Sequence, residues 1–139
     1  MYKIQKTIEI SAAHSLDLPY ESPCTRLHGH NWKIKVFLRS PKLTDYGMIV
    51  DFTDIKREIK GKYDHKNLDD IVGQSTAERL AREICCDINN LLDKLNPGAK
   101  CYKVEVEECE GSFASYEMSE KITICDKEGG VIGAAYRHI

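Results

Sequence analysis

The fold is decided by one alternating stretch, His28-Gly-His-Asn-Trp-Lys-Ile-Lys-Val-Phe-Leu-Arg39. Its even-numbered residues are imidazole or apolar and most of its odd-numbered residues are polar. This period of two predicts a β-strand with one buried face. Because His28 and His30 continue the apolar stripe, both imidazoles should point to the inner face at one end of the strand.

A second alternating stretch, from Tyr2 to His14, places apolar residues at most even positions and polar residues between them. His14 has the parity of the buried set, so a third imidazole is predicted at the end of a neighbouring strand. Three imidazoles leave a tetrahedral zinc with one open position, which is typical of a catalytic site. Imidazole ligands also suit iron, nickel and copper.

The first predicted helix follows the cap residue Asp51, and Gly61 is the expected stop. Its apolar positions, Phe52, Ile55 and Ile59, are spaced as on one buried face.

The second predicted helix begins with Ser75-Thr-Ala-Glu78, which reads as a capping box in which Ser75 and Glu78 satisfy each other's backbone donors. Asn96-Pro-Gly98 ends it. Apolar residues at three- and four-residue steps predict a broad core-facing stripe made of Ala77, Leu80, Ala81, Ile84, Cys85, Ile88, Leu91, Leu92 and Leu95.

Further strands are predicted at 100–109 and near 112–118, and a terminal hairpin at 121–125 and 131–136. On the first of these, Tyr102, Val104, Val106 and Glu108 should face inward. The order β-β-α-α-β-β predicts an α+β fold, an antiparallel sheet with both helices on one face. A chain of 139 residues is expected to form one domain.

Composition excludes several classes of protein. A net charge of -2 with interspersed signs gives no electrostatic case for a nucleic acid or an anionic membrane as partner. No apolar run approaches the ~20 residues that span a bilayer, and the alternating N-terminus is unlike a signal peptide. We therefore expect a cytoplasmic protein whose six cysteines are free thiols, with Cys85 and Cys86 as small buried hydrophobes.

Cys24 precedes His28 by four residues. It is interpreted either as a fourth zinc ligand that closes the site, or as a thiolate acting on a zinc-bound substrate, or as a loop cysteine without a role. Asp64-His65 is either a proton relay, in which the carboxylate orients the ring, or a solvated loop pair.

Glu108 and Thr76 have two interpretations each. A carboxylate on a buried face must be paired, and Glu108 can accept from two parallel N–H donors of a substrate or form a salt bridge with a Lys or Arg. Thr76 is either a helix-start residue or a backbone-level contact to a substrate.

Together these features resemble the 6-pyruvoyl tetrahydropterin synthase family and its relatives, the 6-carboxytetrahydropterin synthases. The resemblance extends from about Tyr2 to Glu117. It rests on six motifs in order: Ser11-Ala-Ala-His14, Cys24-Thr-Arg-Leu-His28-Gly-His30-Asn-Trp, Gly47-Met-Ile-Val-Asp51-Phe, Asp64-His65-Lys-Asn-Leu, Ser75-Thr-Ala-Glu78 and Val106-Glu-Glu108.

The resemblance implies the T-fold, with a four-stranded antiparallel sheet backed by two helices, and trimers that close into barrels and pair as hexamers. It implies 7,8-dihydroneopterin triphosphate as the substrate. It also implies roles for site residues: zinc on His14, His28 and His30, Cys24 as general base, Asp64 and His65 as the relay, and Glu108 as the anchor of the pterin. Thr76 is kept beside Glu108 as a candidate substrate-binding residue.

The three-residue gap between Cys24 and His28 matches the carboxy-forming branch, which serves queuosine and related deazapurine pathways; the alternative is the pyruvoyl-forming enzyme. A cupin-like metal enzyme is disfavoured by the long helix, and a non-catalytic zinc module closed by Cys24 is a further alternative. Glu21 lies close to Cys24 and is an alternative base. Residues 118–139 extend past the family's short members and are expected to add a hairpin.

Overall fold

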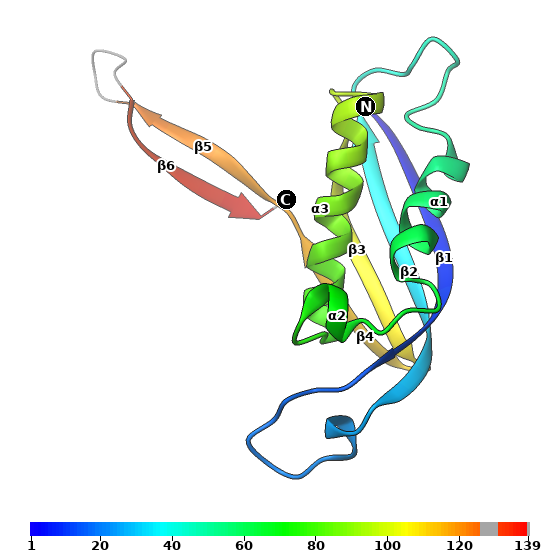
Figure 1. The fold of residues 1–139 in the computed structure, drawn as a ribbon. Coiled ribbons are helices and arrows are strands. Elements are labelled where there is room, and N and C mark those ends of the chain that lie inside the picture. Colours follow the sequence, from blue (N-terminus) through cyan, green and yellow to red (C-terminus); the bar gives the residue numbers. More distant parts are fainter. Residues whose placement is uncertain (126–130, 139) are drawn as a thin grey trace.

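A computed structural model describes residues 1–125 and 131–138, with side chains described up to residue 118. Four antiparallel strands form one sheet in the order β1-β2-β3-β4, and two helices lie on one face of it (Figure 1). This confirms the predicted α+β order. The strands are Tyr2–His14 (β1), His28–Ser40 (β2), Lys100–Cys109 (β3) and Ser112–Glu117 (β4), and the two helices are Phe52–Tyr63 (α1) and Ala77–Leu95 (α3).

Two short elements were not predicted: the 3-10 turn Pro23–Thr25 (η1) and the four-residue helix Asp69–Val72 (α2). Both are too short to show a hydrophobic period, which is why pattern reading misses them. Among the described residues, no helix combines the length and apolar character that crossing a bilayer requires.

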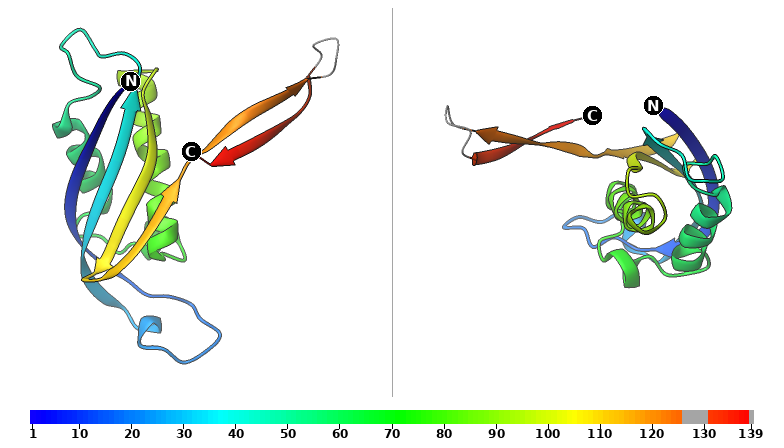
Figure 2. Two further views of the ribbon diagram at one scale, coloured as in Figure 1. Left: turned by 180° about the vertical axis from the view of Figure 1, so that it is seen from behind. Right: turned by 90° about the horizontal axis from the view of Figure 1, so that it is seen from above.

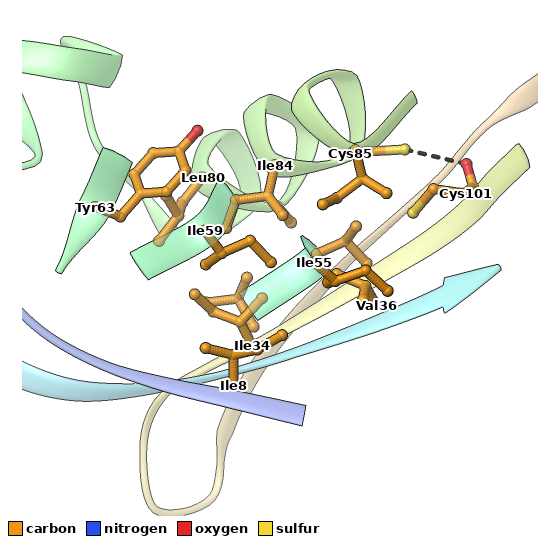
Figure 3. Close-up of a cluster of buried hydrophobic side chains, with 14 of the residues drawn as sticks. Ile8, Ile34, Val36, Ile55, Ile59, Tyr63, Leu80, Ile84, Cys85 and Cys101 are labelled. Carbon is orange, nitrogen blue, oxygen red and sulfur yellow. Dashed lines mark hydrogen bonds between the residues drawn. The ribbon is translucent and has the colours of Figure 1, made fainter. Parts of the chain in front are cut away.

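The core lies between the sheet and the two helices (Figure 3). The inner face of β2 is fully buried over its apolar half, as the alternation predicted. Side chains of both helices cover it, and the strand residues Trp32, Ile34, Val36 and Leu38 meet Ile55 and Ile59 of α1 and Leu80, Ile84 and Ile88 of α3 in one cluster.

β1 and β2 pair in an unbroken antiparallel register from Tyr2 opposite Ser40 to His14 opposite His28. The two imidazoles therefore face each other directly at one end of the ladder. That end lies far from the chain's N-terminus, beside the loop that joins the two strands (Figure 1).

Helix α1 departs from the prediction at both ends of its buried stripe. The Asp51 side chain accepts from the Thr53 N–H at 2.8 Å, so the predicted cap is confirmed. Phe52, however, is 45 % exposed and lies under the Lys6 ammonium. Gly61 does not stop the helix, because Tyr63 is wholly buried and its hydroxyl hydrogen-bonds Asp87 of α3. These contacts outweigh the ~1 kcal/mol cost of a helical glycine.

Helix α3 starts one residue later than the capping box predicted. Thr76, not Ser75, is the N-cap, and its hydroxyl accepts from the Arg79 N–H at 3.2 Å. Ser75 is buried and its hydroxyl donates to Asp69 instead.

The stripe of α3 is buried as predicted except near its end, where Leu91 is half-buried and Leu95 exposed. Cys85 is buried, but Cys86 is exposed, because consecutive helical residues face different directions.

A bulge in β3 reverses the predicted orientation of Tyr102. Phe37 pairs with Lys103 and Leu38 pairs with Cys101, so Tyr102 is the extra residue between them. Cys101 is consequently buried, while the half-buried Tyr102 ring packs beside Phe37 and under Arg39. Val104 and Val106 face the core as predicted.

The predicted terminal hairpin is confirmed as Ser119–Cys125 (β5) paired with Val131–His138 (β6). It forms a separate two-stranded sheet that projects away from the four-stranded one (Figures 1 and 2). Residues 126–130, where the sequence predicts the connection of this hairpin, lie outside the described residues.

Candidate metal centre and active site

Three imidazoles and one carboxylate meet at the end of the sheet. His14 ends β1, His28 and His30 begin β2, and Glu108 is the penultimate residue of β3. One ligand atom from each of these four residues lies within 4.8 Å of all the others. The group is the combined product of strand parity and register, which bring three neighbouring strands to one point.

The three imidazoles stand edge to face. Ring centroids are 4.6 Å apart for His14 and His28, 5.3 Å for His14 and His30, and 4.8 Å for His28 and His30. Trp32 forms the floor, with its ring 4.8 Å from His14 and 5.3 Å from His30. Its indole N–H donates to the Ala12 carbonyl at 3.1 Å. This bond fixes the orientation of the Trp32 ring, against which His14 and His30 pack.

Two of the rings are oriented by backbone carbonyls. His14 Nδ1 lies 2.8 Å from the Ser75 oxygen and His28 Nδ1 lies 2.6 Å from the Arg26 oxygen. A carbonyl only accepts, so in the neutral ring the proton sits on Nδ1 and the lone pair on Nε2.

The Nε2 atoms of His14 and His30 are buried, and neither forms a hydrogen bond of normal geometry although the Glu108 carboxylate lies beside both. Leaving such an atom unpaired costs about 1–3 kcal/mol. A metal ion would remove this cost, because neutral Nε2 atoms are the commonest metal ligands in proteins. The donor set therefore fits a divalent cation such as zinc.

Glu108 faces inward, as its parity predicted, and its carboxylate lies beside the imidazoles. Its Oε1 is 3.1 Å from His30 Nε2 and 4.0 Å from His14 Nε2, and the side chain is 27 % exposed. A salt bridge to a Lys or Arg is not what pairs it here. Burial lowers the pKa of His30 more than the Glu108 charge raises it, and the two other imidazoles lower it further. A neutral ring is the form that binds a metal.

Cys24 lies outside the group of four. It is half-buried in η1, where its N–H donates to the Ser22 hydroxyl at 3.2 Å and its carbonyl accepts from the Leu16 N–H at 2.8 Å. Both bonds anchor the backbone of the 15–27 loop and leave the thiol uncommitted. Glu21, the residue directly before Ser22, is exposed.

Asp64 and His65 touch, which adjacency alone did not guarantee. His65 Nδ1 is 3.2 Å from Asp64 Oδ1, and the ring is 81 % exposed. His65 adopts a left-handed backbone with φ 57°, a conformation uncommon for a residue with a side chain. The Ser11 N–H donates to Asp64 at 2.9 Å and lowers the pKa of its carboxyl.

The segment after α1 is fastened to β1. His65 donates its N–H to Ser11 at 2.7 Å, and Leu68 donates to Ala13 at 2.8 Å. Ala13 in turn donates to Lys66 at 3.1 Å. As a result, His65 and His30 border the same open hollow, together with Ser11, Gly29, Asn31 and Asn67.

Two residues of this region escaped the sequence reading: Ser75 as the carbonyl partner of His14, and Asp69 as the partner of Ser75. Ser75 gave a misleading signal, because its position before Thr76 resembles a cap. Asp69 carries no sequence signal beyond its charge that would have indicated its contact with Ser75. Thr76 is the helix-start residue.

The chain resembles proteins of known class. The family model described as 6-pyruvoyl tetrahydropterin synthase matches residues 3–119. A 6-carboxy-5,6,7,8-tetrahydropterin synthase of Bacillus subtilis is 29 % identical over 140 residues, covering 95 % of this chain and 90 % of the relative. One from Synechocystis sp. is 34 % identical over 91 residues, covering 58 % of this chain and 70 % of that relative.

Among solved structures, 6-pyruvoyl tetrahydropterin synthase of Caenorhabditis elegans superposes with a TM-score of 0.64 at 28 % identity. The match covers 85 % of this chain and 96 % of that one.

Proposed function

Since this chain belongs to the 6-pyruvoyl tetrahydropterin synthase family, we propose that it is a zinc-dependent carbon–oxygen lyase. Its substrates are 7,8-dihydroneopterin triphosphate and one molecule of water, and its products are 6-carboxy-5,6,7,8-tetrahydropterin, triphosphate and acetaldehyde. The observation that carries the proposal is the convergence of His14, His28 and His30, in which two buried Nε2 atoms form no hydrogen bond.

His14, His28 and His30 would hold the zinc. When bound, zinc supplies Lewis acidity that polarises the hydroxyls of the substrate side chain. The remaining chemistry falls to side chains around it.

Cys24 acts as the general base that removes a carbon-bound proton. Cys24 lies on the loop that joins β1 and β2 at the imidazole end of the sheet, and the hydrogen bonds given for this residue are made by its backbone, so the thiol is uncommitted. Positioned acid–base groups contribute typically ~10²–10⁴-fold in rate.

Asp64 and His65 act as the proton relay. The ionised Asp64 orients the His65 ring and stabilises its charged form. Because His65 borders the same hollow as His30, it can exchange protons with a substrate held there.

Glu108 anchors the pterin by accepting from its amino and ring N–H groups. The competing role is a fourth metal ligand, since its Oε1 lies 3.1 Å from His30 Nε2. We favour the anchor because a fourth protein ligand would close a tetrahedral zinc and leave no position for the substrate. Thr76 follows Ser75 at the start of α3, and its backbone is the proposed second contact.

The carboxy-forming product is preferred on the three-residue gap between Cys24 and His28 and on the relatives from Bacillus subtilis and Synechocystis sp.. It would place the enzyme in queuosine or deazapurine biosynthesis. The pyruvoyl-forming reaction is the second candidate, supported by the Caenorhabditis elegans structure.

We further propose trimers that close into barrels and pair as hexamers. The sheet order leaves β1 and β4 as edges, and unpaired edges favour pairing with another copy. Light scattering of the protein during gel filtration would measure its molar mass and so the number of subunits.

The decisive experiment incubates the purified protein with 7,8-dihydroneopterin triphosphate, identifies the product by mass and measures bound zinc in the same sample. Cys24→Ala should keep zinc and lose turnover. Glu108→Ala should keep zinc and raise KM. Loss of zinc in Glu108→Ala would make it a ligand, and a wild type without zinc or product would overturn the proposal.

A further inference from the structure

The His14 imidazole is held by a part of the chain far away in sequence. Its Nδ1 meets the carbonyl of Ser75, sixty-one positions later, at 2.8 Å, and both residues are buried. The corresponding partner of His28 is local, the Arg26 carbonyl two residues before it. The orientation of His14 therefore depends on where the start of α3 sits relative to the end of β1.

Asp69 joins these two places. Its Oδ1 accepts from the Ser75 hydroxyl at 2.6 Å, and its Oδ2 accepts from the Ser15 hydroxyl at 2.6 Å. The Ser15 N–H also donates to both carboxylate oxygens, at 3.1 and 3.0 Å. Since Ser15 follows His14 directly, Asp69 bonds both chain segments that fix this ring.

The Asp69 carboxylate is suited to this work. Burial acts to raise its pKa, but the bonds from Ser15 and Ser75 outweigh burial and the pKa is lowered. An ionised carboxylate accepts shorter and stronger bonds than a neutral amide oxygen. Asp69 is not one of the four residues that can reach a common ion, so its influence on that site is indirect.

We propose that Asp69 is a positioning residue for the metal, acting through Ser75 and Ser15 to hold His14 with Nε2 aimed at the ion. The inference rests on the proposed metal site and adds to it the residue that sets the geometry of one ligand. Residues that orient a metal-bound histidine typically change metal affinity by ~10–100-fold when replaced.

Asp69→Asn tests this with a matched control next door. Asn keeps the size of Asp69 but replaces one acceptor oxygen with a donor, so the bonds from Ser15 and Ser75 cannot all persist. Asp70→Asn removes the same charge at the adjacent, exposed position. Zinc affinity of the metal-free, full-length proteins is measured by competition with a chromophoric chelator.

We expect Asp69→Asn to weaken zinc binding by ~10–100-fold and Asp70→Asn to leave it unchanged. The visible spectrum of the cobalt-loaded protein should change in Asp69→Asn alone, which loss of stability without altered ligand geometry would not produce. Ser75→Ala, which keeps the carbonyl and loses only the hydroxyl, should weaken zinc binding to a smaller extent, and it supplies the test if Asp69→Asn does not fold.

Equal zinc affinity and equal cobalt spectra in Asp69→Asn and wild type would overturn this inference while leaving the proposed function intact. A wild type that binds no zinc would overturn the proposed function, and the role of Asp69 with it.

Discussion

The inner face of β2 carries two surfaces on one strand, produced by the same period of two. From Trp32 to Leu38 it is apolar and covered by α1 and α3. From His28 to His30 it is imidazole and meets His14 and Glu108 from the flanking strands. We call these the apolar half and the imidazole half. The apolar half is complete when the helices pack, whereas at the imidazole half the Nε2 atoms of His30 and of the neighbouring His14 are buried without forming a hydrogen bond.

The difference teaches what alternation can and cannot decide. The alternation along the strand determines which side chains point inward, but the side chains packed against them determine whether they serve as core or as a binding site. Opposite Ile34 and Val36 are aliphatic side chains, so burial alone stabilises them. Opposite His30 are the imidazoles of His14 and His28 and the carboxylate of Glu108. All of these groups carry lone pairs, so a cation or a proton must lie between them.

The largest expected effect is on the imidazole half. Zinc sites in small domains bind with about 10–16 kcal/mol, so loss of one imidazole of three in His30→Ala should cost roughly 4 kcal/mol, or ~1000-fold in zinc affinity. Chelator competition measures it. The stability of the metal-free protein should change little, because relief of a buried nitrogen that forms no hydrogen bond offsets the lost contacts of the ring with Trp32 and Glu108. A large fall in that stability would show that the imidazole half is ordinary core.

Trp32 lies between the halves, and replacing it should disturb both. Trp32→Phe removes the donor to the Ala12 carbonyl and part of the floor under His14 and His30. We expect a loss of about 2 kcal/mol in the free energy of unfolding, measured in urea, with weaker zinc binding. A lower free energy of unfolding without any change in zinc affinity would show that Trp32 supports the core but not the metal site.

In the apolar half, Ile34→Val should lower the free energy of unfolding by about 0.5–1.5 kcal/mol through a small cavity. Zinc affinity should not change, because Ile34 contacts helices and not imidazoles. The adjacent, exposed Lys33→Ala serves as the control and should stay within ~0.5 kcal/mol of wild type. Weaker zinc binding in Ile34→Val would mean that the halves are mechanically coupled.

The smallest effect concerns Asp64, at the margin of the imidazole half. The Ser11 N–H holds the pKa of this carboxyl below its usual 3.8. Its stabilisation is therefore fully present above pH 3.8 and is lost as pH falls through the lowered pKa of the folded state. Asp64→Asn should flatten the acid side of the stability curve by about the 0.5–1.5 kcal/mol of one hydrogen bond. Parallel curves for the two proteins in urea between pH 5 and pH 2 would contradict this.

The sequence predicted most of the fold, because parity and helical spacing are local signals. They placed the inner faces of β1 and β2, the cap at Asp51 and the inward side of Glu108 correctly. The errors come from tertiary contacts that no local pattern contains. Tyr63 carries α1 past Gly61 by packing on α3, and the bulge at Tyr102 turns a predicted core residue outward.

The candidate site divides in the same way. The three imidazoles and Glu108 follow from strand parity, so sequence could bring them together. The contact between Asp64 and His65 is accompanied by a left-handed backbone at His65, and the link from Asp69 to His14 runs through Ser75 and its carbonyl. Neither has a spacing that a sequence pattern could reveal.

The fastening of residues 65–68 to β1 has a consequence for the chain before α1. Because backbone bonds to Ser11 and Ala13 set the place of His65, that place does not depend on the route by which the chain enters the helix. The exposed stretch at 45–48, which precedes the buried Ile49 and Val50, is thus free to vary in length, and a reporter peptide or small domain grafted there should leave the reactive end of the sheet undisturbed. An insertion before α1 can therefore be made without altering the side chains at the imidazole end of the sheet.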